Sequence, residues 1–355
     1  MVNKNIVDIT GGFACPIPKS DYTNILLAHG SGGKMTHELI EKMFLPQFRN
    51  EFLEPLHDGA VFNVGETKFA FSTDSYVVDP IFFPGGDIGE LAVNGTVNDL
   101  AMCGARPLYL SSAFIIEEGL PIDELWKVVL SIQEAAKRAG VVVVTGDTKV
   151  VDRGKGDKLF INTSGIGVVE DGIDIAPKKI QVGDRIILNG DIALHGIAVM
   201  SVREGIDFQT QIKSDTAPLN GLVAEMFKSS RNIHVLRDPT RGGVATTLNE
   251  LAEQSGLGIS IDEESIPVPD DVRGACEILG LDPLYIANEG KLLAFVSPDD
   301  SEKVLSAMRK HPLGKSSVVI GEVVNQHQGT VVMKSEIGGT RVVDMLSGEQ
   351  LPRIC

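Results

Sequence analysis

The sequence predicts a mixed α/β (α+β) protein with two domains and a mobile C-terminal tail. Its 355 residues exceed the usual size of a single hydrophobic core. Along most of the chain, short β-branched runs alternate with amphipathic helical patterns, as in sheets that are covered by helices. We expect an N-terminal extension over residues 1–27, an N-terminal domain over 28–170, a C-terminal domain over 171–335 and the tail over 336–355.

The N-terminal domain is expected to open with a glycine-rich turn and a helix that stops near Pro46, because proline interrupts a helix. Alternating apolar residues on both sides of a Gly-Glu turn predict a hairpin over 60–73. Small apolar residues predict a buried helix over 88–102, and the valine run at 141–144 predicts a fully buried strand. The other elements expected here are a strand over 108–116, an amphipathic helix that ends at Gly140 and a strand over 159–169.

The C-terminal domain follows a linker over 171–182 and repeats the style of alternating strands and helices. Strands are expected over 185–188, 258–261, 292–296, 318–323 and 330–333. Helices are expected over 195–203, 218–228, 244–254, 272–279 and 301–310. Arg241 lies in the turn before the third of these helices, where a helix N-terminus and a guanidinium together favour an anion.

The charge of the chain limits its partners. The formal net charge is −16, and no block of Lys and Arg is long enough to form a basic face. Such a chain repels nucleic acid and anionic membrane surfaces, so we expect neither as a partner. It has no basic-then-apolar signal pattern and no apolar run of membrane-spanning length. The four cysteines are scattered, without zinc-like spacing, which favours a reduced, cytoplasmic protein.

Two patterns in the N-terminal domain suggest binding of a phosphorylated ligand. The turn Ser31-Gly32-Gly33-Lys34 leads into a helix and can direct backbone N–H groups at a phosphate, although it lacks the Walker spacing and could be only a turn. Four acidic residues lie at or near the ends of expected elements, and Asn98 precedes one of them. These residues are Asp58, Asp74, Asp99 and Asp147. Carboxylates that bridge Mg²⁺ to phosphate and ordinary surface caps both explain this pattern.

The last residue, Cys355, is the most unusual candidate. Pro352 prevents a regular helix through the end of the chain, and a terminal segment of this kind is normally mobile unless it is docked. A thiol on a mobile arm can be modified in a pocket and then presented to a partner, although a frayed terminus can also end in cysteine by chance. Glu289 precedes a buried strand, where it could be a general base or an ordinary turn residue.

Taken together, the motifs resemble the HypE family of hydrogenase maturation proteins, in the group that includes aminoimidazole ribonucleotide synthetase and thiamin-monophosphate kinase. The resemblance covers the chain from about Leu27 to Cys355, and the terminal motif is the diagnostic one. The motifs are Ala28-His29-Gly30-Ser31-Gly32-Gly33, Phe71-Ser72-Thr73-Asp74-Ser75, Phe82-Phe83-Pro84-Gly85-Gly86, Asn98-Asp99-Leu100-Ala101, Thr145-Gly146-Asp147-Thr148-Lys149-Val150-Val151, Asp238-Pro239-Thr240-Arg241-Gly242-Gly243, Ala287-Asn288-Glu289-Gly290-Lys291 and Pro352-Arg353-Ile354-Cys355. One departure is Ala193-Leu194, where the family usually has Gly-Asp, and this puts a polar role of that loop in doubt.

The resemblance implies an ATP-dependent carbamoyl dehydratase with an aminoimidazole ribonucleotide synthetase-like fold. A HypF-type carbamoyltransferase would load Cys355, dehydration would give a thiocyanate, and the cyanide would pass to iron on the HypC–HypD complex. It also implies a homodimer whose N-terminal sheets pack together, with ATP near that interface.

The resemblance also gives the site residues their roles. Ser31, Gly32, Gly33 and Lys34 would cover the phosphates of ATP, with Asn98 nearby. Asp74, Asp99 and Asp147 would hold Mg²⁺ and ATP, with Asp58 as a further candidate. Glu289 would accept the proton, with Lys149 as the alternative base and as a group that offsets developing charge.

Two rival functions remain open at this stage, and a third, a selenophosphate synthetase, is disfavoured. A sibling kinase or synthetase that acts on a free small molecule would share the nucleotide residues but would not need Cys355. A selenophosphate synthetase would carry a reactive cysteine in the glycine-rich loop, which this chain lacks. A non-catalytic scaffold would only present its tail to partners.

Overall fold

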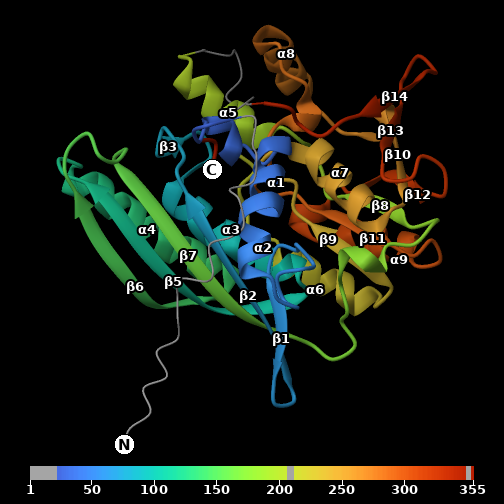
Figure 1. Cartoon of the computed structure of the whole chain (residues 1–355), viewed down its shortest axis with the longest axis horizontal. Coiled ribbons are helices and arrows are strands. Elements are labelled where there is room, and N and C mark those ends of the chain that lie inside the picture. Colours follow the sequence, from blue (N-terminus) through green and yellow to red (C-terminus); the bar gives the residue numbers. More distant parts are fainter. Residues whose placement is uncertain (1–21, 206–211, 349–352) are drawn as a thin grey trace, which may run out of the picture.

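The computed structural model describes residues 22–205, 212–348 and 353–355. Two β-sheets form the two halves of the molecule, with helix α3 (Ile88–Met102) between them (Figure 1). The mixed α/β class is therefore confirmed. No helix in these described ranges has the length and hydropathy to cross a bilayer.

The first sheet has five strands in the order β1-β2-β7-β5-β6. All neighbours are antiparallel except β5 and β6, which are parallel. Helices α3 and α4 (Ile122–Ala139) lie on its inner face, and a small hairpin of β3 (Phe82–Phe83) and β4 (Gly86–Asp87) precedes α3. The five strands are β1 (Ala60–Val64), β2 (Thr67–Tyr76), β5 (Ala105–Glu117), β6 (Val142–Val151) and β7 (Leu159–Val169).

The second sheet has seven strands in the order β14-β13-β10-β12-β8-β11-β9. Side chains alternate along its strands, so Ile187 of β8 faces one hydrophobic cluster with α6 and α9, while Ile186 and Leu188 face the other with α7. Its strands are β8 (Arg185–Leu188), β9 (Ile233–Arg237), β10 (Gly258–Asp262), β11 (Leu293–Val296), β12 (Val318–Val324), β13 (Val331–Lys334) and β14 (Thr340–Val343). Its helices are α5 (Leu194–Arg203), α6 (Asn220–Ser229), α7 (Gly243–Ser255), α8 (Asp270–Leu279) and α9 (Ser301–Met308).

The prediction of a buried strand at the valine run was wrong. Strand β6 lies at the edge of its sheet, and Val142 and Val144 are each 57% exposed. A groove of about 960 Å³ separates β6 from α4 and is lined by apolar side chains such as Val143 and Ile132. A run of valines fits a strand, but it does not say whether the same chain covers both faces.

The first helix ends near Pro46, as predicted, two residues past it. Helix α1 (Lys34–Leu39) continues through a π-helical turn (Ile40–Phe44) into α2 (Leu45–Phe48), which contains the proline. One other boundary differs from the predictions. Strand β14 lies inside the predicted tail and pairs with β13 through Met333 and Arg341, so regular structure extends past residue 336.

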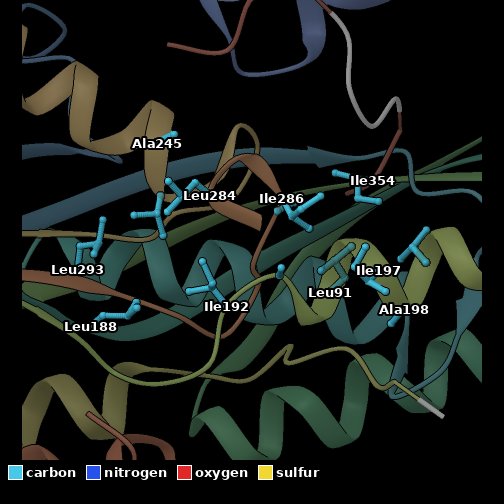
Figure 2. Close-up of a cluster of buried hydrophobic side chains, with 14 of the residues drawn as sticks. Leu91, Leu188, Ile192, Ile197, Ala198, Ala245, Leu284, Ile286, Leu293 and Ile354 are labelled. Carbon is cyan, nitrogen blue, oxygen red and sulfur yellow. The ribbon is translucent and has the colours of Figure 1, made fainter. Parts of the chain in front are cut away.

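The end of the chain is part of the core. Ile354 is only 2% exposed and belongs to the same cluster of buried side chains as Ile197 and Ile286 (Figure 2). Burial of an isoleucine side chain contributes about 1.5–3 kcal/mol. The described end of the tail, residues 353–355, is therefore docked on the folded domains, and we call it the docked tail.

Candidate active site

The docked tail lies along the end of strand β2. The Val77 N–H donates to the Cys355 carbonyl at 2.9 Å, and the Asp79 N–H donates to the Arg353 carbonyl at 3.3 Å. Arg203 also donates to the Arg353 carbonyl, at 2.8 Å, and the Arg353 side chain pairs with Asp157. These contacts place Cys355 beside β2, between the two sheets.

Charged side chains surround the Cys355 thiol. Burial raises the pKa of this thiol above its usual range, and Glu289, Asp74 and Asp238 raise it further. The Arg241 guanidinium opposes this rise, and the interaction with Cys355 is the main cause that raises the pKa of Arg241. While it is docked, the thiol therefore stays protonated at neutral pH and is a poor nucleophile.

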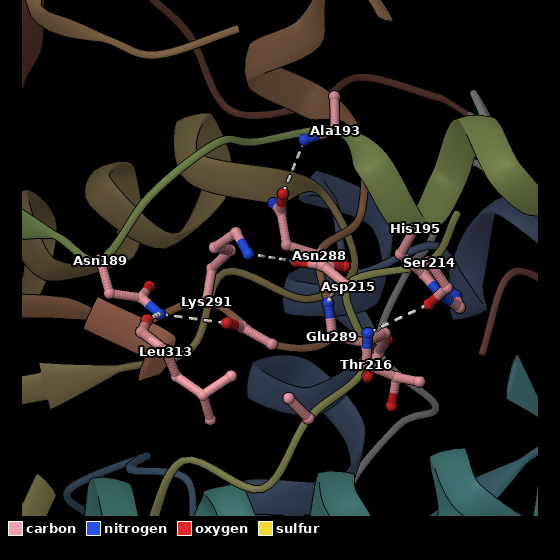
Figure 3. Close-up of polar contacts among 12 residues, drawn as sticks. Asn189, Ala193, His195, Ser214, Asp215, Thr216, Asn288, Glu289, Lys291 and Leu313 are labelled. Carbon is pink, nitrogen blue, oxygen red and sulfur yellow. Dashed lines mark hydrogen bonds and ion pairs between the residues drawn. The ribbon is translucent and has the colours of Figure 1, made fainter. Parts of the chain in front are cut away.

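Among the buried acidic residues near Cys355, Glu289 has the properties of a general base. It is 4% exposed, and its Oε1 has no hydrogen-bond partner among the described residues. Its backbone is fixed from two sides, because its N–H donates to Asp215 Oδ1 at 3.2 Å (Figure 3) and its carbonyl accepts from Asn98 Nδ2 at 3.3 Å. Burial raises the pKa of Glu289 well above its ordinary value, with Asp238 as the largest charge effect. A group of this kind can take up a proton within the site.

Four carboxylates lie close to one another near Glu289. They are Asp58 before β1, Asp74 on β2, Asp99 on α3 and Asp238 after β9. Burial raises the pKa of Asp99 well above its ordinary value, and the charges of Asp238, Asp74 and Asp58 add to the rise. Asp99 Oδ2 accepts a hydrogen bond from Ser72 Oγ at 2.6 Å. The structure therefore brings together three of the four predicted acidic residues and adds Asp238.

The ion pair between Asp58 and Arg237 balances part of this charge. Arg237 Nε lies 2.8 Å from Asp58 Oδ1, and Arg237 Nη2 donates to Glu250 at 2.7 Å. The second oxygen of Asp58 has no hydrogen-bond partner in the described part of the chain. That oxygen and the like charge of the cluster fit a divalent cation, which binds carboxylate oxygens.

No three side chains of the described residues are grouped closely enough to enclose a metal ion by themselves. A cation at this cluster would therefore need further oxygen ligands. Phosphate groups and waters are the usual ones for Mg²⁺. The residues present fit a metal that arrives with a phosphorylated ligand.

The glycine-rich turn packs between Arg241 and the segment before the docked tail. A side chain at Gly32, whose φ is +78°, would come within 2.7 Å of Arg241 Cβ, and one at Gly33 would come within 2.4 Å of the Leu346 carbonyl oxygen. The Lys34 N–H donates to that same carbonyl at 2.9 Å, and Ser31 Oγ donates to the Gly348 carbonyl at 3.2 Å. The turn therefore lies against the segment that leads to Cys355.

Asp147 and Lys149 lie apart from this cluster. Asp74 pairs across the sheet with Thr163, then Ser112 and Gly146, and this row faces α3. Asp147 is one residue farther along β6, so it points to the opposite face of the sheet. Lys149 Nζ lies 2.6 Å from Asp147 Oδ1, and both side chains are more than 60% exposed. Within one chain these two residues do not meet Glu289, and their roles in binding and proton transfer stay predictions.

Sequence reasoning missed three residues of the site as site residues: Asp238, Asp215 and His195. Asp238 follows β9 in the same motif as Arg241, and an acidic residue before Pro-Thr-Arg was an available signal. Asp215 lies in a loop and His195 in the first turn of α5, neither in a pattern of its own, and only the fold brings them to Glu289 and the docked tail.

Known proteins share this architecture. Residues 56–169 match the family model of the AIR synthase related protein N-terminal domain, and residues 181–334 match that of the C-terminal domain. The carbamoyl dehydratase HypE of Azotobacter vinelandii is 52% identical to this chain over 332 residues, which cover 94% of this chain and 97% of that protein. The chain belongs to the HypE family. The resemblance that the motifs suggested is thereby confirmed.

Solved HypE structures have the same fold. A HypE in a HypE–HypF complex is 49% identical, with a TM-score of 0.83 over 87% of this chain and 99% of that chain. A HypE in complex with ATP is also 49% identical, with a TM-score of 0.79 over 94% of this chain and 100% of that chain. The expected two-domain fold is therefore correct.

The departure from the HypE pattern at Ala193 has a clear local geometry. Ala193 has a φ of +70°, a left-handed conformation that favours glycine. Its N–H donates to Asn288 Oδ1 at 2.7 Å (Figure 3), so the backbone of this loop makes a polar contact to the residue before Glu289.

Proposed function

We propose that this HypE protein uses ATP to dehydrate an S-carbamoyl group on its own Cys355 to a thiocyanate. The observation that carries the proposal is the docked tail, which places the Cys355 thiol among Glu289, Arg241 and Asp74. A kinase that acts on a free small molecule would have no use for a cysteine at this place. The product then supplies the cyanide ligand for the iron of [NiFe]-hydrogenase.

The reaction needs a leaving group and a base. The amide oxygen of the carbamoyl group attacks the γ-phosphorus of ATP, and ADP leaves while Glu289 takes one N–H proton. The C–O bond then breaks, inorganic phosphate leaves with the former amide oxygen, and loss of the second N–H proton completes the C≡N bond. Arg241 lies where it would stabilise charge that develops beside the sulfur and oxygen. The buried surroundings keep water away from the activated intermediate.

Nucleotide and metal would use the cluster and the glycine-rich turn. We propose that Ser31, Gly32, Gly33 and Lys34 cover the phosphates and that Asn98 helps to hold this ligand. We propose Asp58, Asp74, Asp99 and Asp147 as metal-site residues. Bound Mg²⁺ would offset the negative charge of the carboxylates and phosphates during phosphoryl transfer.

Asp147 and Lys149 would take part in the site only with a second copy of the chain. They lie on the outer face of the first sheet, which also carries exposed apolar side chains such as Val142 and Tyr109. We propose a homodimer that covers this face and brings these two residues near the nucleotide. The other partners in this proposal are a HypF-type carbamoyltransferase and the HypC–HypD complex, all in the cytoplasm.

Intact-mass measurement tests the function. The chain is incubated with a HypF-type carbamoyltransferase, carbamoyl phosphate and ATP, and the mass should rise by one carbamoyl group and then fall by one water. Both changes should be absent in Cys355→Ala. A carbamoylated chain whose mass ATP leaves unchanged would refute the dehydratase.

Variants of the two base candidates refine the test. Glu289→Gln should accept the carbamoyl group but lose water about 10²–10⁴-fold more slowly, the usual effect of removing a general base. Glu118→Gln, which changes an exposed glutamate, is the matched control. If Lys149→Met slows dehydration and Glu289→Gln does not, Lys149 is the base.

A further inference from the structure

His195 is buried completely and contacts the docked tail directly. Its Nε2 lies 2.8 Å from the Ile354 carbonyl oxygen, so this nitrogen carries the proton and donates. Ile354 is the residue immediately before Cys355. A hydrogen bond to its carbonyl fixes the last peptide group, from which the thiol extends.

The other ring nitrogen is fixed as well. Ser214 Oγ lies 2.8 Å from His195 Nδ1, which accepts the hydroxyl proton because Nε2 is the donor. Ser214 Oγ in turn accepts from the Thr216 N–H at 3.1 Å (Figure 3). The Phe83 ring and the imidazole pack in a T-shaped arrangement, with the ring centroids 5.3 Å apart. The ring therefore has one tautomer and one orientation, as burial also favours its neutral form.

The segment that orients His195 also orients Glu289. Between Ser214 and Thr216 lies Asp215, whose Oδ1 accepts from the Glu289 N–H and whose Oδ2 lies 3.2 Å from Lys291 Nζ. The Ser214 N–H donates to the Pro84 carbonyl at 2.8 Å, which ties the segment to the β3–β4 hairpin. Residues 214–216 thus connect His195, which holds the tail beside the thiol, to the backbone of Glu289, the proposed base.

We propose that His195 is a positioning residue for the proposed reaction: its Nε2–H holds the Ile354 carbonyl so that Cys355 and its carbamoyl group stay beside Glu289. The proposal rests on the dehydratase function only for its catalytic consequence. The two hydrogen bonds of the His195 ring go to Ile354 and Ser214 and not to the sulfur or the base, so it acts through the last peptide group of the tail. Loss of this hydrogen bond should release the tail more often and leave the rest of the site intact.

Two variants that differ in side-chain length distinguish a positioning role of His195 from a packing role. Glutamine places its amide nitrogen near the position of Nε2, so His195→Gln can still donate to the Ile354 carbonyl. Asparagine is shorter, so His195→Asn reaches only the position of Nδ1 and leaves that carbonyl without its donor. Both variants put an amide in the same buried place, so each is the control for the other.

The first measurement is alkylation of Cys355 by iodoacetamide, followed on the C-terminal peptide by mass spectrometry, without ATP or carbamoyl phosphate. His195→Asn should raise the alkylation rate about fivefold, the effect of one lost hydrogen bond, and His195→Gln should stay near the unmodified chain. Equal rates in the two variants would overturn the proposal. If His195→Asn does not fold, Ser214→Ala decides: it frees the ring from its other side, and an unchanged alkylation rate overturns the proposal.

The second measurement is single-turnover dehydration of the carbamoylated chain. His195→Asn should slow the loss of water several-fold while carbamoyl transfer to Cys355 stays equal or becomes faster, because loading needs the released tail. A chain damaged in folding would lose both steps. Because the alkylation measurement involves no nucleotide, it tests the role of His195 even if the dehydratase assignment fails.

Discussion

Arg237 Nε lies 2.8 Å from Asp58 Oδ1, and this ion pair connects the end of β9 in the second sheet to the residue two before β1 in the first. Both side chains are about nine-tenths buried. Among the described residues, the Asp58 carboxylate pairs with two basic side chains, those of Arg237 and the neighbouring His57. The pair with Arg237 therefore supports both the packing of the two sheets and the charge balance of the cluster.

Arg237→Met should destabilise the protein by about 3–5 kcal/mol, because it leaves Asp58 buried without its partner. Urea unfolding measures the change. Arg185→Met removes the exposed pair between Arg185 and Glu322 and should cost less than about 1 kcal/mol. Equal losses in the two variants would show that the buried pair has no special weight.

Asp238→Asn should flatten the dependence of stability on pH. Burial, with Asp58 adding to it and Arg237 opposing, raises the pKa of Asp238 from 3.8 to about 8. The folded state therefore binds this proton more tightly than the unfolded state, and its stability contribution is lost as pH rises through about 8. The unmodified protein should melt at a lower temperature at about pH 8 than at about pH 6, and the variant should show a smaller difference. Asp344→Asn, which changes an exposed carboxylate, should keep the original slope.

Gly33→Ala should disturb the contact between the glycine-rich turn and the segment before the docked tail. The added methyl group would meet the Leu346 carbonyl oxygen at 2.4 Å, which forces one of the two segments to move. Such overpacking typically costs about 1–3 kcal/mol. We expect a lower melting temperature and faster alkylation of Cys355. Gly30→Ala has open space for its methyl group and is the control, with no change expected in either measurement.

Val142→Glu should break the proposed homodimer. Val142 is 57% exposed on the outer face of the first sheet, next to Tyr109. A carboxylate there would be desolvated in a dimer that covers this face. Analytical ultracentrifugation should show a monomer, while Ile278→Glu on helix α8, where the side chain is 72% exposed, should leave the dimer intact. A variant that sediments like the unmodified chain would place the interface elsewhere.

Much of the fold could be predicted from the sequence, because periodicity and punctuation agree in most elements. Helix α3 has the predicted bounds, and α4 ends at Gly140 with a φ of +70°, as a glycine C-cap requires. Strands β9 and β14 were missed. β9 mixes apolar with basic residues and runs directly into the Asp-Pro turn, and β14 lies in a stretch rich in glycine and polar residues, so neither has a strong pattern of its own.

The candidate site could be predicted only in part, for a geometric reason. Strand register decides which face a carboxylate occupies, and a shift of one residue reverses that face. Asp74 and Asp147 looked equivalent in the sequence, but they point to opposite faces of the same sheet. His195 could not be assigned a role, because its partner Ile354 is 159 residues away in the chain.

The burial of Ile354 has a consequence for the transfer of the cyanide group to its acceptor. When the docked tail leaves its site, it leaves a hydrophobic cavity in the protein and exposes the isoleucine side chain to water. Release of the tail therefore costs free energy, whatever group the sulfur carries. An acceptor protein would favour release of the docked tail most if it offered a hydrophobic pocket for the Ile354 side chain. Recognition of the cargo would then begin one residue before the sulfur, at a side chain that takes no part in the chemistry.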